Sequence, residues 1–248
     1  MQPDARLIPA SSEDAPLLFL FDIDGTLLLS GGAGTRVLNR VFFRHHGVDD
    51  AMKRVSPGGK TDPLIVGEMF VNSLGRAPST AEYNQIMSDY EAELAAEMTS
   101  SPGFRLMPDV HDVLATLAQN PKVVLAIATG NSEAGARAKL HRAKLLDYFL
   151  NGGTFPSGGY GSDSSERHQL VAVAISRAQA ASGLQFPPGR IVVVGDTLHD
   201  ISAARQCGVN VIAVTTGGPS RVELETGLPD AIIDCLSELL NLPPWSFD

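Results

Sequence analysis

The chain has 248 residues, of which 44% are hydrophobic and 19% charged, so it can bury a sizeable core and is not disordered as a whole. Its net charge of −9 argues against nucleic acid or an anionic membrane as the main partner. Its two cysteines argue against a disulfide scaffold and favour a reducing compartment. Residues 1–14 show no signal-peptide pattern, and no apolar run reaches the length of a membrane span. We therefore expect a cytoplasmic protein.

The first predicted element is a buried strand that runs into two carboxylates. The apolar run 17–21 suits a strand in the middle of a parallel sheet, and Asp22 and Asp24 follow it directly. Residues two apart in an extended chain point to the same side, so both carboxylates face one small volume. Such a pair is tolerated when a cation lies between the two groups or when one of them holds a proton. A polar turn after a core strand is the alternative reading of this stretch alone.

The next stretch, residues 35–104, is predicted to be helical without a strand. Three segments have apolar residues at helical spacing, and Ser79 with Glu82 forms a capping box at the start of the third. The predicted helices are 35–46, 62–74 and 79–99. We interpret this stretch as a subdomain inserted after the first strand.

From Pro108 onward, strands and helices alternate, which is typical of a doubly wound parallel sheet. The predicted strands are 123–128, 191–194 and 211–215, with a further short strand within 149–155. The predicted helices are 109–119, 132–144, 165–182, a short one ending at 207, and 236–240.

Polar residues follow two of these strands, as they follow the first. Thr129 offers a hydroxyl, and Gly130 and Asn131 offer backbone N–H groups at a predicted helix start, which is a seat for phosphate. Asp196 is a hard oxygen ligand for Mg²⁺, and Asp200, one helical turn later, can hold a metal-bound water or orient its neighbours. Helix entry and helix capping explain each group separately, but the three groups in this order indicate one site at the strand ends.

These motifs resemble those of the haloacid dehalogenase-like hydrolases. Asp22-Ile23-Asp24-Gly25-Thr26-Leu27 resembles the first motif, Thr129 the second, and Gly195-Asp196-Thr197-x-x-Asp200 the fourth. The insertion resembles the helical C1-type cap of the phosphoglycolate phosphatase and β-phosphoglucomutase-like branch. Its Gly59-Lys60-Thr61-Asp62 resembles the cap loop that reaches the active site there. The resemblance implies a Rossmann-like α/β core, residues 1–31 and 105–248, and an inserted all-helical cap, residues 32–104.

The third motif departs from the family pattern, which usually places a lysine before the fourth motif. The best-placed cation here is Arg167, which can neutralise phosphate charge with a planar, permanently charged fork. Lys139 and Lys144 are weaker candidates because they belong to the helix after the second motif. An exposed arginine beside Glu166 is the alternative reading of Arg167.

The resemblance implies a Mg²⁺-dependent phosphatase that works through an aspartyl phosphate. Asp22 is then the nucleophile, and Asp24 protonates the leaving alkoxide and afterwards takes a proton from water. Asp22, the carbonyl of Asp24, and Asp196 are the implied metal ligands.

The same resemblance implies how the substrate is held. Thr129, Gly130, Asn131 and Arg167 surround the phosphate, while Lys60 in the cap loop touches the rest of the substrate. The expected partner is a small phosphorylated metabolite, with neither nucleic acid nor membrane, and we expect a monomer or a homodimer.

Other functions remain open on the same core. A phosphosugar mutase uses the same core. A phosphonate hydrolase needs a cap lysine that forms a Schiff base, for which Lys53 and Lys60 are candidates. A dehalogenase needs no metal and lacks the second aspartate, so Asp24 and Asp196 argue against it. A non-enzymatic regulatory binding module would have little reason to keep clustered carboxylates, which are costly without a metal.

Overall fold

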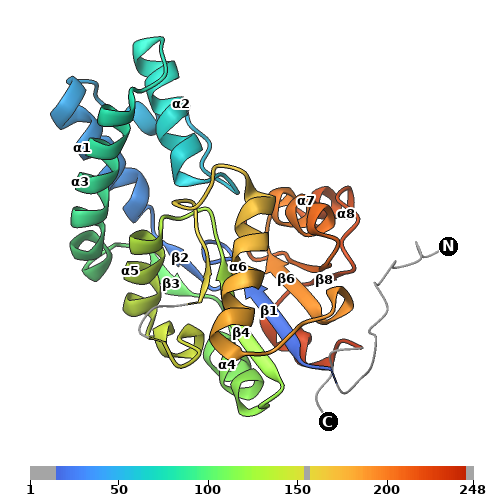
Figure 1. Ribbon diagram of the computed structural model, residues 1–248. Coiled ribbons are helices and arrows are strands. Elements are labelled where there is room, and N and C mark those ends of the chain that lie inside the picture. Colours follow the sequence, from blue (N-terminus) through green and yellow to red (C-terminus); the bar gives the residue numbers. More distant parts are fainter. Residues whose placement is uncertain (1–14, 154–156, 244–248) are drawn as a thin grey trace.

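The computed structural model describes residues 15–153 and 157–243, and its centre is a parallel sheet of six strands in the order β5-β4-β1-β6-β7-β8 (Figure 1). The expected lead-in at residues 1–14 lies outside the described residues. The strands of this sheet are β1 (Leu17–Phe21), β4 (Val123–Ala128), β5 (Gly158–Gly159), β6 (Ile191–Gly195), β7 (Asn210–Val214) and β8 (Ala231–Ile233). The predicted doubly wound α/β architecture is thereby confirmed.

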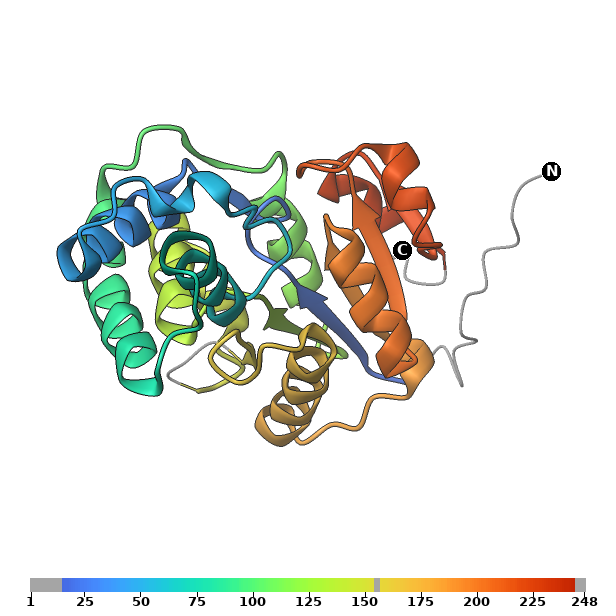
Figure 2. The same cartoon turned by 90° about the horizontal axis from the view of Figure 1, so that it is seen from above.

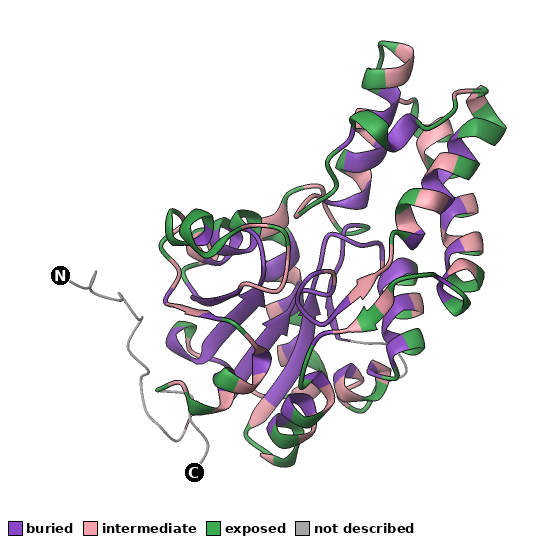
Figure 3. Ribbon diagram, turned by 180° about the vertical axis from the view of Figure 1, so that it is seen from behind, coloured by how far each residue is buried: buried purple, intermediate pink, exposed green. Residues whose placement is uncertain are grey.

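Strand β1 lies between β4 and β6 and is buried on both faces (Figure 3). Leu17, Phe19 and Phe21 pack on one side, while Leu18 and Leu20 belong to the apolar cluster on the other side. This alternation follows from the two-residue period of a strand, and burial of both faces explains why the run is apolar throughout.

Helices cover both faces of the sheet. The first face is covered by α4 (Val110–Gln119), α5 (Glu133–Ala143) and the 3-10 helix η4 (Leu236–Asn241). The second face is covered by α6 (Arg167–Ser182), α7 (Leu198–Cys207) and α8 (Arg221–Glu225). The 3-10 helices η2 (Leu146–Phe149) and η3 (Pro188–Arg190) lie in the connections between these elements.

A second group of helices stands to one side of the sheet and has its own apolar cluster (Figure 2). It consists of α1 (Ala33–His46), the 3-10 helix η1 (Ala51–Arg54), α2 (Asp62–Leu74) and α3 (Thr80–Thr99). The predicted capping box at the start of α3 is present, with Ser79 and Glu82 each accepting a backbone hydrogen bond from the other. A small antiparallel sheet of β2 (Leu28–Ser30) and β3 (Phe104–Leu106) lies where the chain leaves the core and returns to it.

Some predicted elements differ in the structure. The strand expected within 149–155 is absent from the described part of that stretch, which holds the end of η2 and a turn, while residues 154–156 lie outside the described residues. The edge strand is instead Gly158–Gly159. Glycine has a low β propensity, so these two residues do not predict a strand. The segment 236–240 is a 3-10 helix, and β2, β3 and β8, of three residues each, were not predicted because periodicity cannot reveal such short strands.

The acidic chain thus folds around a buried sheet with a helical group beside it. Within residues 15–153 and 157–243, no helix is both long and apolar enough to cross a bilayer.

Candidate active site

The three predicted polar signatures meet at one edge of the sheet. Strands β4, β1 and β6 are parallel neighbours, and Thr129, Asp22 and Asp196 each follow the last residue of one of them. The backbone N–H of Asp22 donates to the carbonyl oxygen of Val194 at 2.9 Å, so the sheet itself fixes the position of Asp22. The carboxyl ends of parallel strands are where ligands bind in such sheets.

Three buried aspartates form a cluster at this edge. Carboxylate oxygens of Asp22, Asp196 and Asp200 lie within 4.8 Å of one another, and each residue is at most 6% exposed. Burial raises the pKa of Asp22 even though Arg167 opposes the shift. Burial also raises the pKa of Asp196, and the charges of Asp22 and Asp200 add to that shift. Like charges so close together in a buried place need a cation or a proton between them.

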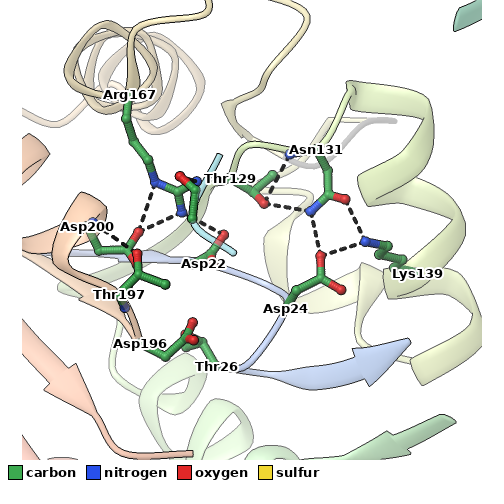
Figure 4. A network of polar contacts seen from close by, with 11 residues as sticks. Asp22, Asp24, Thr26, Thr129, Asn131, Lys139, Arg167, Asp196, Thr197 and Asp200 are labelled. Carbon is green, nitrogen blue, oxygen red and sulfur yellow. Dashed lines mark hydrogen bonds and ion pairs between the residues drawn. The ribbon is translucent and has the colours of Figure 1, made fainter. Parts of the chain in front are cut away.

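Arg167, the first residue of α6, lies inside this cluster (Figure 4). Its Nη2 is 3.0 Å from Oδ1 of Asp22 and 2.6 Å from Oδ1 of Asp200, and its Nε donates to the same Asp200 oxygen at 3.0 Å. The side chain is 10% exposed, so it is not the surface arginine of the alternative reading. Burial alone would lower its pKa, but Asp200 and Asp22 raise it above the ordinary value, and the guanidinium stays charged.

Asp24 is held by a second cation, Lys139, whose place in the helix after the second motif made it only a weaker candidate. Lys139 Nζ lies 2.5 Å from Oδ2 of Asp24 and 2.6 Å from Oδ1 of Asn131, and its side chain is 6% exposed. The amide nitrogen of Asn131 donates to the same Asp24 oxygen at 2.8 Å and to the hydroxyl oxygen of Thr129 at 2.8 Å (Figure 4). Lys139 and the side chain of Asn131 therefore both contact Asp24 in the candidate site.

The phosphate-binding site expected at the start of α5 differs from a plain helix N-terminus. The helix begins at Glu133, and Ser132 caps it by accepting from the N–H of Gly135 at 3.2 Å. The N–H of Asn131 points to the Thr129 hydroxyl at 3.4 Å. The hydroxyl of Thr129 hydrogen-bonds to Asp22, and Gly130 lines the same cavity.

Asp200 and Asp196 each have supporting partners. Asp200 Oδ2 accepts from the hydroxyl of Thr197 at 2.6 Å and from its N–H at 3.0 Å, which caps α7. Asp196 Oδ1 accepts from the hydroxyl of Thr26 at 3.1 Å. Gly25, at a φ of 88°, lies so close to the Asp196 carboxylate that an added Cβ would clash with it.

The loop before α2 reaches the core at this site. The N–H of Asp62 donates to the carbonyl oxygen of Gly130 at 2.8 Å, and Oδ2 of Asp62 accepts from the N–H of Ser132 at 2.8 Å. A Cβ on Gly130 would clash with the carbonyl oxygen of Lys60, so glycine permits this close approach. The Lys60 side chain is paired with Glu68 of the same helical group, at 2.6 and 2.7 Å.

A cavity of about 760 Å³ lies between the core and the helical group. Asp22, Asp24, Asp196 and Arg167 line it on the core side, and residues of all four helices of the helical group line the other side. Its size is in the range of about 300–1,000 Å³ that small-molecule sites usually have.

The donor set fits a divalent cation. Asp22 and Asp196 are buried, they offer hard carboxylate oxygens, and the proximity of the two charges disfavours the ionised forms unless a positive ion compensates them. Asp200 lies in the same cluster, but its oxygens are engaged by Arg167 and Thr197. Asp22 and Asp196 are therefore the better placed to bind such an ion directly.

Comparison with known proteins identifies the family. The model of the haloacid dehalogenase-like hydrolases matches residues 19–205, well over half of the chain, and a related hydrolase-like model matches residues 172–239. A phosphoglycolate phosphatase of Synechococcus elongatus is 33% identical over 140 residues, which cover 56% of this chain and 60% of that protein. A phosphoglycolate phosphatase of Agrobacterium fabrum is 28% identical over 231 residues, covering 90% of each chain.

Solved structures share the fold at lower identity. A hydrolase from Pseudomonas syringae superposes with a TM-score of 0.68 at 21% identity, over 91% of this chain and 96% of that one. A predicted phosphoglycolate phosphatase from Haemophilus somnus gives 0.67 at 19% identity, over 94% and 99%. Together with the site at the strand ends, the family match shows that this chain belongs to the haloacid dehalogenase-like hydrolases and is an enzyme of that family.

Proposed function

We propose that the protein is a Mg²⁺-dependent phosphatase that hydrolyses a small phosphate monoester through an aspartyl phosphate on Asp22. The observation that carries the proposal is the arrangement around Asp22, which has Arg167 at 3.0 Å, buried acids beside it, and Asp24 on the same strand end. The names of the phosphatase relatives support the same reaction class. We assign residues 32–104 the role of the cap and residues 1–31 and 105–248 that of the core.

The reaction divides into two steps on this chain's own residues. In the first, Asp22 attacks phosphorus and the ester oxygen leaves as the alcohol after taking a proton from Asp24. In the second, Asp24 takes a proton from water, which attacks the phosphorus and frees inorganic phosphate and Asp22. Both hydrogen bonds that hold Asp24 are made to Oδ2, so we assign the proton exchange to Oδ1.

The remaining residues hold charge in place. Arg167, with Thr129 and the backbone at Gly130, is positioned to stabilise the phosphoryl oxygens as negative charge spreads over them. A divalent ion bound by Asp22, the Asp24 carbonyl and Asp196 would screen the approach of one anion to another. Asp200 keeps Arg167 oriented through two hydrogen bonds. In this proposal Arg167, Thr129 and the divalent ion act on the phosphate, and Asp24 acts on the leaving group.

The test compares Asp24→Asn with Asp22→Asn on p-nitrophenyl phosphate in the presence of Mg²⁺. p-Nitrophenolate leaves without much protonation, so Asp24→Asn should give a burst of product followed by slow turnover, with phosphate trapped on the protein. Asp22→Asn should give neither burst nor trapped phosphate. The assignment of the two aspartates would be reversed if Asp22→Asn kept the burst and Asp24→Asn lost it, and absence of any Mg²⁺-dependent turnover would end the phosphatase proposal.

A further inference from the structure

Part of the cavity wall that the helical group contributes is apolar. Each of the four helices of the helical group contributes one apolar side chain to its lining: Leu38 from α1, Met52 from η1, Ile65 from α2 and Tyr90 from α3. All four residues are at most 6% exposed, so they form part of the helical group's own apolar cluster and show the cavity only a small, fixed surface. A leaving group that reaches this surface gains by burying apolar atoms there.

The cations that line the cavity are already neutralised within the protein. In the described part of the chain the lining includes Lys60, Lys139 and Arg167. Lys139 is paired with Asp24, and Arg167 with the aspartates of the core cluster. Lys60, which comes from the cap loop, is held by both oxygens of Glu68 at 2.6 and 2.7 Å. The basic residue His199 also lies on the lining, and it is exposed to solvent.

Carboxylates outnumber these cations on the same lining. The acidic residues there are Asp22, Asp24, Asp62, Asp196 and Glu223. A phosphate group can be compensated by Arg167 and by a divalent ion. A second anionic group on the same substrate would have to displace an existing ion pair or remain unpaired among these carboxylates. Displacing the nearly buried Lys139 or Arg167 from its partner is costly, whereas Lys60 and Glu68 are 24% and 39% exposed, so their pair is the easiest to exchange.

We propose that the preferred substrate of this site carries an uncharged leaving alcohol with an aryl or branched alkyl part, and that esters with a second anionic group, such as 2-phosphoglycolate, are disfavoured. This inference rests on the proposed phosphatase function. The size of the cavity supports it, because about 760 Å³ leaves room for a leaving group much larger than glycolate. The phosphate would lie at Asp22 and the apolar part among Leu38, Met52, Ile65 and Tyr90.

The first test compares benzyl phosphate with 4-carboxybenzyl phosphate, which differ in charge and have similar leaving alkoxides. The expected kcat/KM is about tenfold or more higher for benzyl phosphate, and 2-phosphoglycolate should also fall below benzyl phosphate. Equal or better turnover of either carboxylate-bearing ester would overturn the inference. Turnover of none of the three esters or p-nitrophenyl phosphate would instead count against the proposed function. In that case, calorimetric binding of the two benzyl esters to Asp22→Asn decides the inference, which requires tighter binding of the uncharged ester.

The second test changes the partner of Lys60. Glu68→Gln frees the ammonium group, so the preference for benzyl phosphate over its carboxylated analogue should narrow by about fivefold to tenfold. Asp49→Asn removes the same charge from an exposed position of the helical group and should leave this preference as it is in the wild type. An unchanged preference in Glu68→Gln, or an equal change in both variants, would show that the Lys60–Glu68 pair does not set selectivity.

Discussion

At the scale of single residues, the least expected feature is the contact between Lys139 and Asp24. Lys139 Nζ and the Asn131 amide both bind one oxygen of Asp24, so the carboxylate that exchanges the proton in the proposed reaction is fixed on one side. Lys139 is therefore a positioning residue, since it acts through Asp24. A displacement of about 1 Å at such a group can cost roughly a hundredfold in rate.

Replacing Lys139 with methionine should release Asp24 without leaving a hole. We expect kcat to fall about 10- to 100-fold with a smaller change in KM, because the phosphate contacts remain. The loss should be larger for benzyl phosphate than for p-nitrophenyl phosphate, since only the poorer leaving group depends strongly on the proton from Asp24. Steady-state kinetics with both esters measures this difference.

The matched control is Lys144→Met, which removes an exposed lysine from the end of the same helix. It should keep wild-type kinetics with both esters. Equal losses on both substrates in Lys139→Met would indicate a general structural role instead.

The spacing of residues in α5 indicates that Lys139 is buried. The buried residues of α5 are Gly135, Ala136, Lys139, Leu140 and Ala143, so the lysine occupies the apolar stripe of an amphipathic helix. A lysine in that stripe must find an acceptor for its ammonium group, because an unpaired buried ammonium is costly. The partner itself could not be predicted, since Asp24 lies 115 residues away and only the folded sheet brings the two together.

At the scale of elements, the loop before α2 and the first residue of that helix, Asp62, join the helical group to the core. Its carboxylate accepts from the N–H of Ser132, the N-cap residue of α5, and is 6% exposed. Burial raises the pKa of Asp62 to about 6; nearby Lys139 lowers it, while Asp24 and Glu91 raise it. The sequence predicted that this loop reaches the site, but not that Asp62 makes the contact.

The pKa of Asp62 gives the stability of the protein a pH dependence of known sign. A carboxyl group whose pKa is raised on folding makes its full contribution to stability at pH values below its ordinary pKa of 3.8. This contribution is lost as the pH rises through the pKa in the folded protein, which is about 6. Asp62→Asn keeps an acceptor without the charge, so it should be more stable than the wild type at about pH 8, by about 3 kcal/mol. At about pH 4 the two should be nearly equal. Urea unfolding at both pH values measures the difference.

The comparison variant is Asp62→Ala, which removes the charge and the acceptor together. It should be less stable than Asp62→Asn at either pH by about 1–3 kcal/mol, because the buried N–H of Ser132 loses its partner. A difference between Asp62→Asn and the wild type that stays constant with pH would contradict the assignment of the shift to Asp62.

At the scale of the whole molecule, the topology was predictable and the edges were not. Long apolar runs that end in polar residues identified β1, β4 and β6 as buried strands of a parallel sheet, but their order in the sheet is known only from the structure. The edge strand β5 consists of two glycines, and β8 has three residues, so their positions depend on neighbouring strands and not on their own sequence. The cavity is likewise a property of the assembled chain, since its lining comes from residues 22 to 223.

Mg²⁺ should stabilise the whole fold, because the buried acids of the core lie on neighbouring strand ends that folding brings together. A ligand at about 100 times its Kd adds about 2.7 kcal/mol, which for a chain of this size raises the Tm by roughly 5–10 °C.

The pKa values of Asp22 and Asp196 are raised, so without metal these groups favour the fold at low pH and disfavour it as the pH rises. The rise in Tm caused by Mg²⁺ should therefore be larger at about pH 8.5 than at about pH 6. At the higher pH these carboxyl groups have lost their protons, and the ion compensates their charge instead. Asp196→Asn should raise the Tm of the metal-free protein at high pH and should abolish the rise in Tm caused by Mg²⁺. Asp49→Asn should show the same Mg²⁺-dependent rise as the wild type. Calorimetric scans at both pH values measure these shifts, and an undiminished Mg²⁺ response in Asp196→Asn would remove Asp196 from the proposed metal site.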